Sequence, residues 1–207
     1  MGIVMMLAMI GFTSCDDFLD ITPTGKVIAK TGKEYRALLT YEYKNFSEDR
    51  GLATLRSDEM TLSKASTSTE DYDSYFDIWA WNDLNQQSTT ASFGWRRYYH
   101  AIYIANYIIE NQTKITEATQ DEISQLVGEA YMMRAYCHFL LVNLYADAYT
   151  HCNPATTRGI PLSLEANVNN VLTCSSVEQV YQQVIADIKE AKTRLKVAAW
   201  DEGYTYR

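Results

Sequence analysis

The feature that most constrains the fold is the segment from Thr119 to Leu144, which has the pattern of one long and largely apolar helix. Thr119 and Glu122 have the spacing of a capping box, in which each side chain accepts a hydrogen bond from the other residue's backbone N–H. A helix that is apolar over so much of its circumference packs at the centre of a helical array, and at ~1.5 Å per residue it would be roughly 40 Å long. Its main stripe comprises Ile123, Leu126, Val127, Ala130, Met133, Cys137, Leu140, Leu141 and Leu144, and a neighbouring face carries Met132, Ala135, Tyr136, Phe139 and Val142.

Three further segments, at about 31–44, 91–112 and 175–195, also have helical periodicity. The first and third begin at capping-box patterns, which pair Thr31 with Glu34 and Ser175 with Glu178. The polar stretches 45–90 and 149–174 are expected to be irregular, and no strand hairpin stands out. Helices joined by such loops indicate an all-α chain built as an α–α solenoid, although no repeat of fixed period is visible. The apolar faces of the three segments comprise Tyr35, Leu38 and Leu39 (with Glu42), then Tyr98, Ile102, Ala105 and Ile109, and then Val177, Val180, Tyr181, Val184, Ile188, Ala191 and Leu195.

The N-terminal residues are predicted to lie outside the fold. The apolar run Ile3–Phe12 is too short to span a bilayer but suits the apolar region of a secretory signal peptide. Thr13 and Ser14 precede Cys15 as in a lipoprotein cleavage site. We therefore expect a signal peptide at 1–14, a lipid on Cys15 and a tether at 15–30, and the alternative is an ordinary secretory signal followed by a chance cysteine.

Several function classes are disfavoured by the sequence. The net charge of −8 argues against nucleic-acid binding, which needs a basic face. His100, His138 and His151 lack the spacing of metal ligands, and no nucleotide-binding or nucleophile-elbow motif is present, so we expect no metal, no cofactor and no enzyme activity. The one catalytic alternative is a glycosidase that uses Asp71 and Asp73.

An aromatic cluster in the polar stretch 45–90 is the candidate ligand site. Aromatic residues make up 13% of the chain, and rings combined with side-chain amides can stack on sugars and hydrogen-bond their hydroxyls. The alternative is that Trp79 and Trp81 are buried and only stabilise the loop. The candidate ligand-binding residues are Tyr75, Trp79, Trp81, Asn82 and Asn85.

The sequence also leaves two possible side-chain pairings open. Arg134 lies on the apolar central helix and therefore needs a carboxylate or carbonyl partner if it is buried; its candidate carboxylates are Glu129, Asp147 and Asp187. Cys152 and Cys174 could form a disulfide in an oxidising compartment.

Five segments, in this order and spacing, give the chain a resemblance to the N-terminal part of the SusD/RagB family, the surface nutrient-binding lipoproteins of Bacteroidetes. The most specific segment is Gly128–Asp147, with Gly128, Glu129, Ala130, Arg134 and Ala135 at the family's positions and Ala146 where glycine is usual. The others are Cys15–Asp20 with Pro23, the helix carrying Trp95, Tyr98, Ile102, Ala105 and Asn106, the Gly159–Leu162 turn, and the Val177–Leu195 helix with Tyr181, Ile185, Asp187 and Ala191.

This resemblance implies a tetratricopeptide-like helical array of α-hairpins with long irregular loops. It implies an outer-membrane lipoprotein, exposed to the exterior, that captures glycans or other nutrient oligomers without catalysis and delivers them to a SusC-like TonB-dependent transporter. Family members are more than twice as long, so residues 31–207 are expected to be an incomplete N-terminal SusD-like domain. The alternatives are a structural or interaction subunit without its own ligand site, or a truncated remnant.

Overall fold

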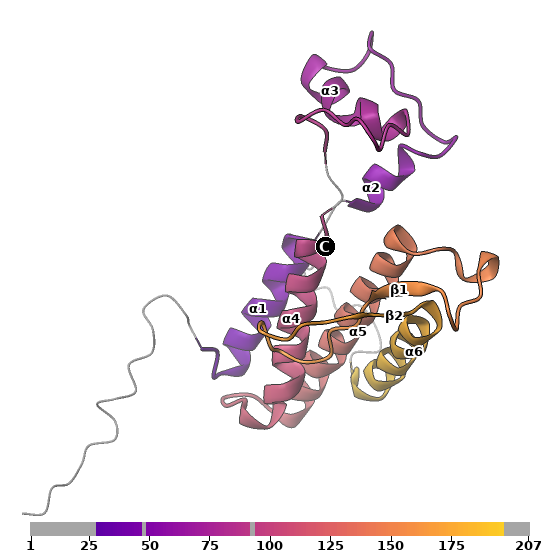
Figure 1. The fold of residues 1–207 in the computed structure, drawn as a ribbon. Helices are drawn as coiled ribbons and strands as arrows, with labels where there is room; N and C mark the ends of the chain where they lie inside the picture. The colour runs from indigo at the N-terminus through magenta and orange to yellow at the C-terminus, as the bar shows by residue number, and fades with distance from the viewer. Residues whose placement is uncertain (1–27, 47–48, 92–93, 197–207) are drawn as a thin grey trace, which may run out of the picture.

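The centre of the structure is α5 (Gln120–Tyr145), which packs against α4 (Trp95–Asn111) on one side and α6 (Val177–Arg194) on the other (Figure 1). This computed structural model describes residues 28–46, 49–91 and 94–196. The first helix, α1 (Gly32–Lys44), packs against α4. The chain is therefore mainly helical, and the predicted fold class is confirmed.

The capping boxes at the starts of α1 and α5 are confirmed. Thr119 accepts a hydrogen bond from the backbone N–H of Glu122 at 3.2 Å, and the Glu122 carboxylate accepts one from the Thr119 N–H at 2.7 Å. Thr31 and Glu34 form the same arrangement. The main stripe of α5 is buried from Leu126 to Leu141 and partly buried at its ends, Ile123 and Leu144, but on its neighbouring face Met132, Tyr136 and Phe139 are each 41% exposed.

Arg134 is buried and has a carboxylate partner, Asp187, which was one of the three expected candidates. Its guanidinium donates to both carboxylate oxygens of Asp187 on α6, at 2.8 and 2.6 Å, and to the side-chain oxygen of Asn106 on α4 at 2.8 Å. Asn106 in turn donates to the carbonyls of Ser163 and Glu165, each at 3.1 Å. This Arg134 network therefore ties three helices and one loop together through satisfied polar groups.

Small residues permit the close approach of α5 and α6. A Cβ atom added at Gly128 would lie 3.1 Å from atoms of Arg194 and Leu195 at the end of α6. Gly128 therefore serves helix packing.

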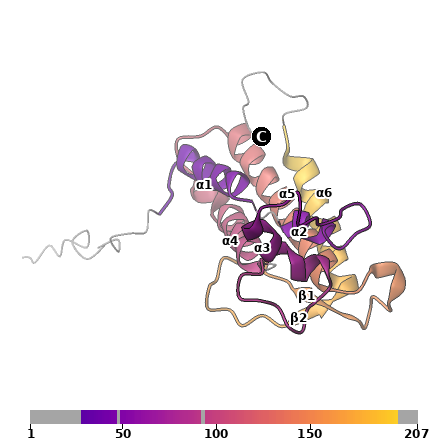
Figure 2. The same ribbon diagram turned by 90° about the horizontal axis from the view of Figure 1, so that it is seen from above.

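The stretch 45–90 was expected to be irregular, and this expectation is wrong for two of its segments. It contains α2 (Asp49–Thr54) and α3 (Thr69–Trp79), which form a lobe at one end of the helical array (Figures 1 and 2). The prediction failed for α3 because the Ser/Thr-rich residues before it obscure a valid helix start, in which Ser68 accepts from the Asp71 N–H.

A short antiparallel ladder, which the sequence analysis also missed, joins β1 (Arg158–Pro161) to β2 (Cys174–Ser176). A Cβ at Gly159 would lie 3.0–3.1 Å from backbone atoms of residues 175–177, so glycine is needed where β1 passes the start of α6. The predicted capping box is wrong by one residue: Ser175 lies within β2, and Ser176 pairs with Gln179 instead.

The structure also decides several smaller expectations. Helix α4 begins at Trp95 rather than residue 91, and a 3-10 turn follows it at Gln112–Lys114. Cys152 and Cys174 are free thiols. His100 and His138 lie in helices, and His151 ends a second 3-10 turn at Tyr149–His151.

At the N-terminus, the predicted signal peptide 1–14, Cys15 and most of the predicted tether 15–30 lie outside the described residues. The last tether residues lie on the helical body, because Ala29 is buried and the Lys30 carbonyl accepts from the Thr116 N–H at 2.9 Å. Among the helices that the structure describes, none has the length and apolar character needed to cross a bilayer.

Candidate functional site

The predicted ligand residues lie on α3 and on the loop that follows it. Tyr75 and Trp79 are four residues apart and so share one side of α3, where both are half-buried. Phe76 lies 5.3 Å from the ring centre of Tyr72 and 6.0 Å from that of Trp79. Trp79 is therefore part of an aromatic row that stabilises the helix, and only part of its ring is accessible.

The loop after α3 is held by a single buried carboxylate, that of Asp77. It accepts hydrogen bonds from the Thr90 hydroxyl at 2.6 Å, from the Gln87 backbone N–H at 2.7 Å and from the Asn82 side chain at 2.9 Å. These three donors, with Thr90 contributing most, hold the pKa of Asp77 below its ordinary value, and burial acts in the opposite direction. We call this arrangement the Asp77 clamp.

Trp81 follows Ala80, the C-cap of α3, and has an unusual backbone conformation. Its φ of 56° lies in the left-handed region, which a glycine usually occupies after a helix C-terminus and which costs other residues roughly 1–2 kcal/mol. Its ring is nevertheless 63% exposed. The Arg56 guanidinium lies 4.8 Å from the ring centre and also pairs with Asp83, so one face of the ring is backed by a fixed cation. The alternative that both tryptophans are buried is therefore wrong for Trp81.

The two asparagines have different environments. Asn82 is half-buried, and its side-chain N–H groups are engaged by Asp77 and by the carbonyl of Asn85 at 3.2 Å. Asn85 itself is exposed. The structure thus gives Asn82 a role in shaping the loop and leaves the Asn85 side chain on the surface.

Three residues that shape the site were missed in the sequence: Arg56, Asp77 and Asp83. Asp77 carried a usable signal, because an acid between Phe76 and Ile78 near a helix end must find donors if it is buried. Arg56 and Asp83 lie 27 residues apart and match no motif, so only the folded chain brings them together.

The carboxylates of the glycosidase alternative are not paired. Asp71 lies in the first turn of α3 and accepts from the Ser68 hydroxyl at 2.7 Å. Asp73 is two residues further along, and residues two apart point to different sides of a helix. Among the described residues, no group of three metal-ligating side chains lies close enough to hold a metal ion.

Comparison with known proteins gives a family match over residues 17–205, to a group of SusD-like proteins described as starch-binding and associating with the outer membrane. A SusD-like protein of Formosa agariphila, P38, is 33% identical over 129 residues, which are 60% of this chain and 22% of that protein. A second from the same organism, P25, is 24% identical over 119 residues, or 57% of this chain and 23% of that protein. The aligned part is thus under a quarter of the length of either relative.

Solved structures share the fold. A SusD superfamily protein from Bacteroides vulgatus matches 84% of this chain and 39% of its own, with a TM-score of 0.69 and 20% identity. A second protein of the same organism, described as sugar-binding, matches 83% of this chain and 38% of its own, with a TM-score of 0.66 and 20% identity. At this identity the likeness concerns the helical scaffold.

Proposed function

The chain belongs to the SusD-like family, and on that basis we propose that it binds carbohydrate at the outer membrane and hands it to a SusC-like TonB-dependent transporter. Capture of glycans or other nutrient oligomers needs no catalytic group. The unpaired positions of Asp71 and Asp73 on α3 agree with a binding role rather than hydrolysis.

The observation that carries this proposal is the presentation of Trp81. Trp81 is exposed although its backbone conformation costs free energy. Such strain is typical of functional sites, where the surrounding structure holds a side chain in position to bind a ligand. The Asp77 clamp fixes the loop, and Arg56 backs one face of the ring. The exposed part of the ring can stack on the C–H face of a sugar, and Trp79 and Asn85 belong to the same lobe.

The test is Trp81→Ala, measured by isothermal titration calorimetry with maltoheptaose and a panel of neutral oligosaccharides of other linkages. We expect affinity for the best oligosaccharide to fall by about tenfold or more, because about 1.4 kcal/mol corresponds to a factor of ten and ring stacking contributes on that order. Leu84→Ala is the matched control, since Leu84 is 95% exposed on the same loop and offers no ring. Equal affinity for wild type and Trp81→Ala would remove Trp81 from the site.

A second candidate is an interaction subunit without its own ligand site. The exposed Met132, Tyr136 and Phe139 on α5 favour it, because they leave apolar surface in the described structure. This candidate predicts co-purification with an outer-membrane transporter but no binding to any oligosaccharide in the panel.

The lipid anchor and the domain limits complete the proposal. We assign residues 1–14 to a signal peptide, 15–30 to a lipid-bearing tether and 31–207 to the N-terminal SusD-like domain. Metabolic labelling with a radioactive fatty acid should mark the wild-type protein, and Cys15→Ser should abolish labelling and release the protein from the membrane fraction. Retained labelling in Cys15→Ser would contradict the assignment.

A further inference from the structure

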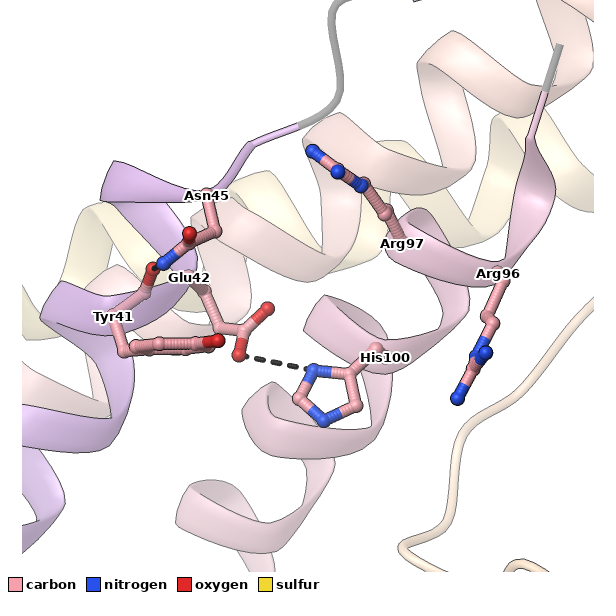
Figure 3. Close-up of a pocket in the computed structure, with 6 residues that line it drawn as sticks. All are labelled: Tyr41, Glu42, Asn45, Arg96, Arg97 and His100. Carbon is pink, nitrogen blue, oxygen red and sulfur yellow. Dashed lines mark hydrogen bonds and ion pairs between the residues drawn. The ribbon is translucent and has the colours of Figure 1, made fainter. Parts of the chain in front are cut away.

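A pocket of about 310 Å³ lies between α1 and α4 (Figure 3). None of its lining residues belongs to α3 or to the loop that carries Trp81. This volume is at the lower end of the range typical of small-molecule sites. Its lining residues are Tyr41, Glu42 and Asn45 from α1 and its C-terminus, and Arg96, Arg97 and His100 from α4.

Glu42 is the unusual residue in this pocket. It is only 5% exposed, although it lines the cavity, and its Oε1 accepts no hydrogen bond from any described residue. His100 Nδ1 lies 3.0 Å from that oxygen, but the contact becomes an ion pair only when His100 is protonated. A buried carboxylate is stabilised by hydrogen-bond donors, and because Glu42 lines the cavity, a ligand hydroxyl in the pocket can donate to its carboxylate.

Two arginines of α4 line the same pocket. Arg96 and Arg97 lie in the first turn of α4, where the helix dipole is positive and where no acidic residue is present. Within the described parts of the chain neither arginine forms an ion pair. In Figure 3 the Arg97 guanidinium extends toward Asn45 at the end of α1, whereas Arg96 extends past His100 and away from α1.

This local charge runs against the character of the whole chain. With a net charge of −8, the protein as a whole repels anions. Two arginines without ion-pair partners, at the positive end of a helix, therefore provide an attraction that acts only near the pocket. Tyr41 adds a ring that is 59% exposed beside Glu42, which suits the apolar face of a sugar.

We propose that the pocket between α1 and α4 binds an acidic sugar residue, with Arg97 holding its anionic group, Glu42 accepting from a hydroxyl and Tyr41 contacting the ring. This inference rests on the proposed carbohydrate binding and adds a second site with its own specificity. The shared chemistry is an anionic group on a sugar, which a uronic acid supplies as carboxylate and a sulfated sugar as sulfate.

The test compares three probes by calorimetry with the purified protein: trigalacturonate, the neutral galactose trisaccharide of the same linkage, and a sulfated galactose trisaccharide. We expect one of the acidic probes to bind about tenfold or more tightly than the neutral one, and which of them does so identifies the anion. Added salt should weaken this preference, because the arginines are exposed.

An exposed cation outside the pocket provides the control. Arg97→Gln should lower the affinity for the acidic probe by about tenfold or more, whereas Lys189→Gln removes the same charge from an exposed position on α6 and should change the affinity less than about threefold. Equal losses in the two variants would mean diffuse attraction rather than a site, and would overturn the proposal. So would equal affinity for acidic and neutral probes.

Trp81→Ala separates this inference from the proposed function. If Trp81→Ala abolishes binding of every probe and Arg97→Gln changes none, the carbohydrate function stands and the second site falls. If no neutral or acidic oligosaccharide binds, both fall.

Discussion

Replacing Asp187 with asparagine would remove one charge from the Arg134 network while keeping the size of the side chain. Both residues are buried, and the two hydrogen bonds between them are 2.8 and 2.6 Å long. The substitution leaves the Arg134 guanidinium buried without its carboxylate. Breaking a buried pair in this way costs about 3–5 kcal/mol, which is a large part of the roughly 5–15 kcal/mol that stabilises a typical domain.

The assay is urea unfolding of the purified protein, followed by far-ultraviolet circular dichroism. With a slope of about 2 kcal/mol per molar urea, a loss of about 3–5 kcal/mol lowers the midpoint by roughly 1.5–2.5 M. Glu190→Gln is the control, because Glu190 forms an exposed pair with Arg194 four residues away, a kind of contact that contributes about 0.3–0.5 kcal/mol.

A double variant separates the cost of an unpaired charge from the value of the pair. Arg134→Met with Asp187→Leu removes both charges, so the free energy of unfolding should recover much of what Asp187→Asn loses. The reasoning would be refuted if Asp187→Asn lost less than about 1 kcal/mol, or no more than Glu190→Gln.

Three other substitutions test the scaffold by the same unfolding assay. Burial and then the charge of Arg134 lower the pKa of His138 to about 3, so as the pH falls below about 6.5 the unfolded state binds a proton that the folded state does not, and the free energy of unfolding falls. His138→Gln should make this fall between pH 6.5 and 5 less steep by up to about 1.4 kcal/mol per pH unit. An unchanged slope would contradict the lowered pKa of His138. Thr119→Ala should lower the free energy of unfolding by about 1 kcal/mol through loss of the α5 cap, whereas an unaltered midpoint would mean that the cap is dispensable. Gly128→Val should lower the free energy of unfolding by about 1–3 kcal/mol, because the valine side chain would contact the end of α6 too closely. An unfolding midpoint equal to that of wild type would show that α6 can move aside.

The scaffold was predictable because its determinants are local or follow from burial. The caps at Thr31 and Thr119 are short-range patterns, and the structure shows both. Arg134 on an apolar helix required a partner, and Asp187 was among the three candidates. The cap predicted at Ser175 was off by one residue, because two serines are adjacent there and Ser176, which also pairs with Arg158 in the β1–β2 ladder, forms the capping box with Gln179.

The aromatic lobe was less predictable because its shape depends on contacts that no local pattern encodes. The Asp77 clamp draws donors from five, ten and thirteen residues further along the chain. Arg56 reaches Trp81 and Asp83 from the other side of a Ser/Thr-rich stretch. The residue types indicated the tryptophans as candidate ligand residues, but the exposure of Trp81 depends on how the loop folds.

The residues that make the family recognisable and the residues proposed to choose a ligand belong to different parts of the molecule. Gly128, Arg134 and Asn106 are buried at the contacts among α4, α5 and α6, where packing and charge pairing permit few replacements. Trp81 and Arg97 are exposed, so their side chains are not part of the buried packing among the helices. A relative can therefore keep the whole Arg134 network and bind a different sugar, so the family match supports carbohydrate binding as a class while the choice of sugar must be read from the lobe and the pocket.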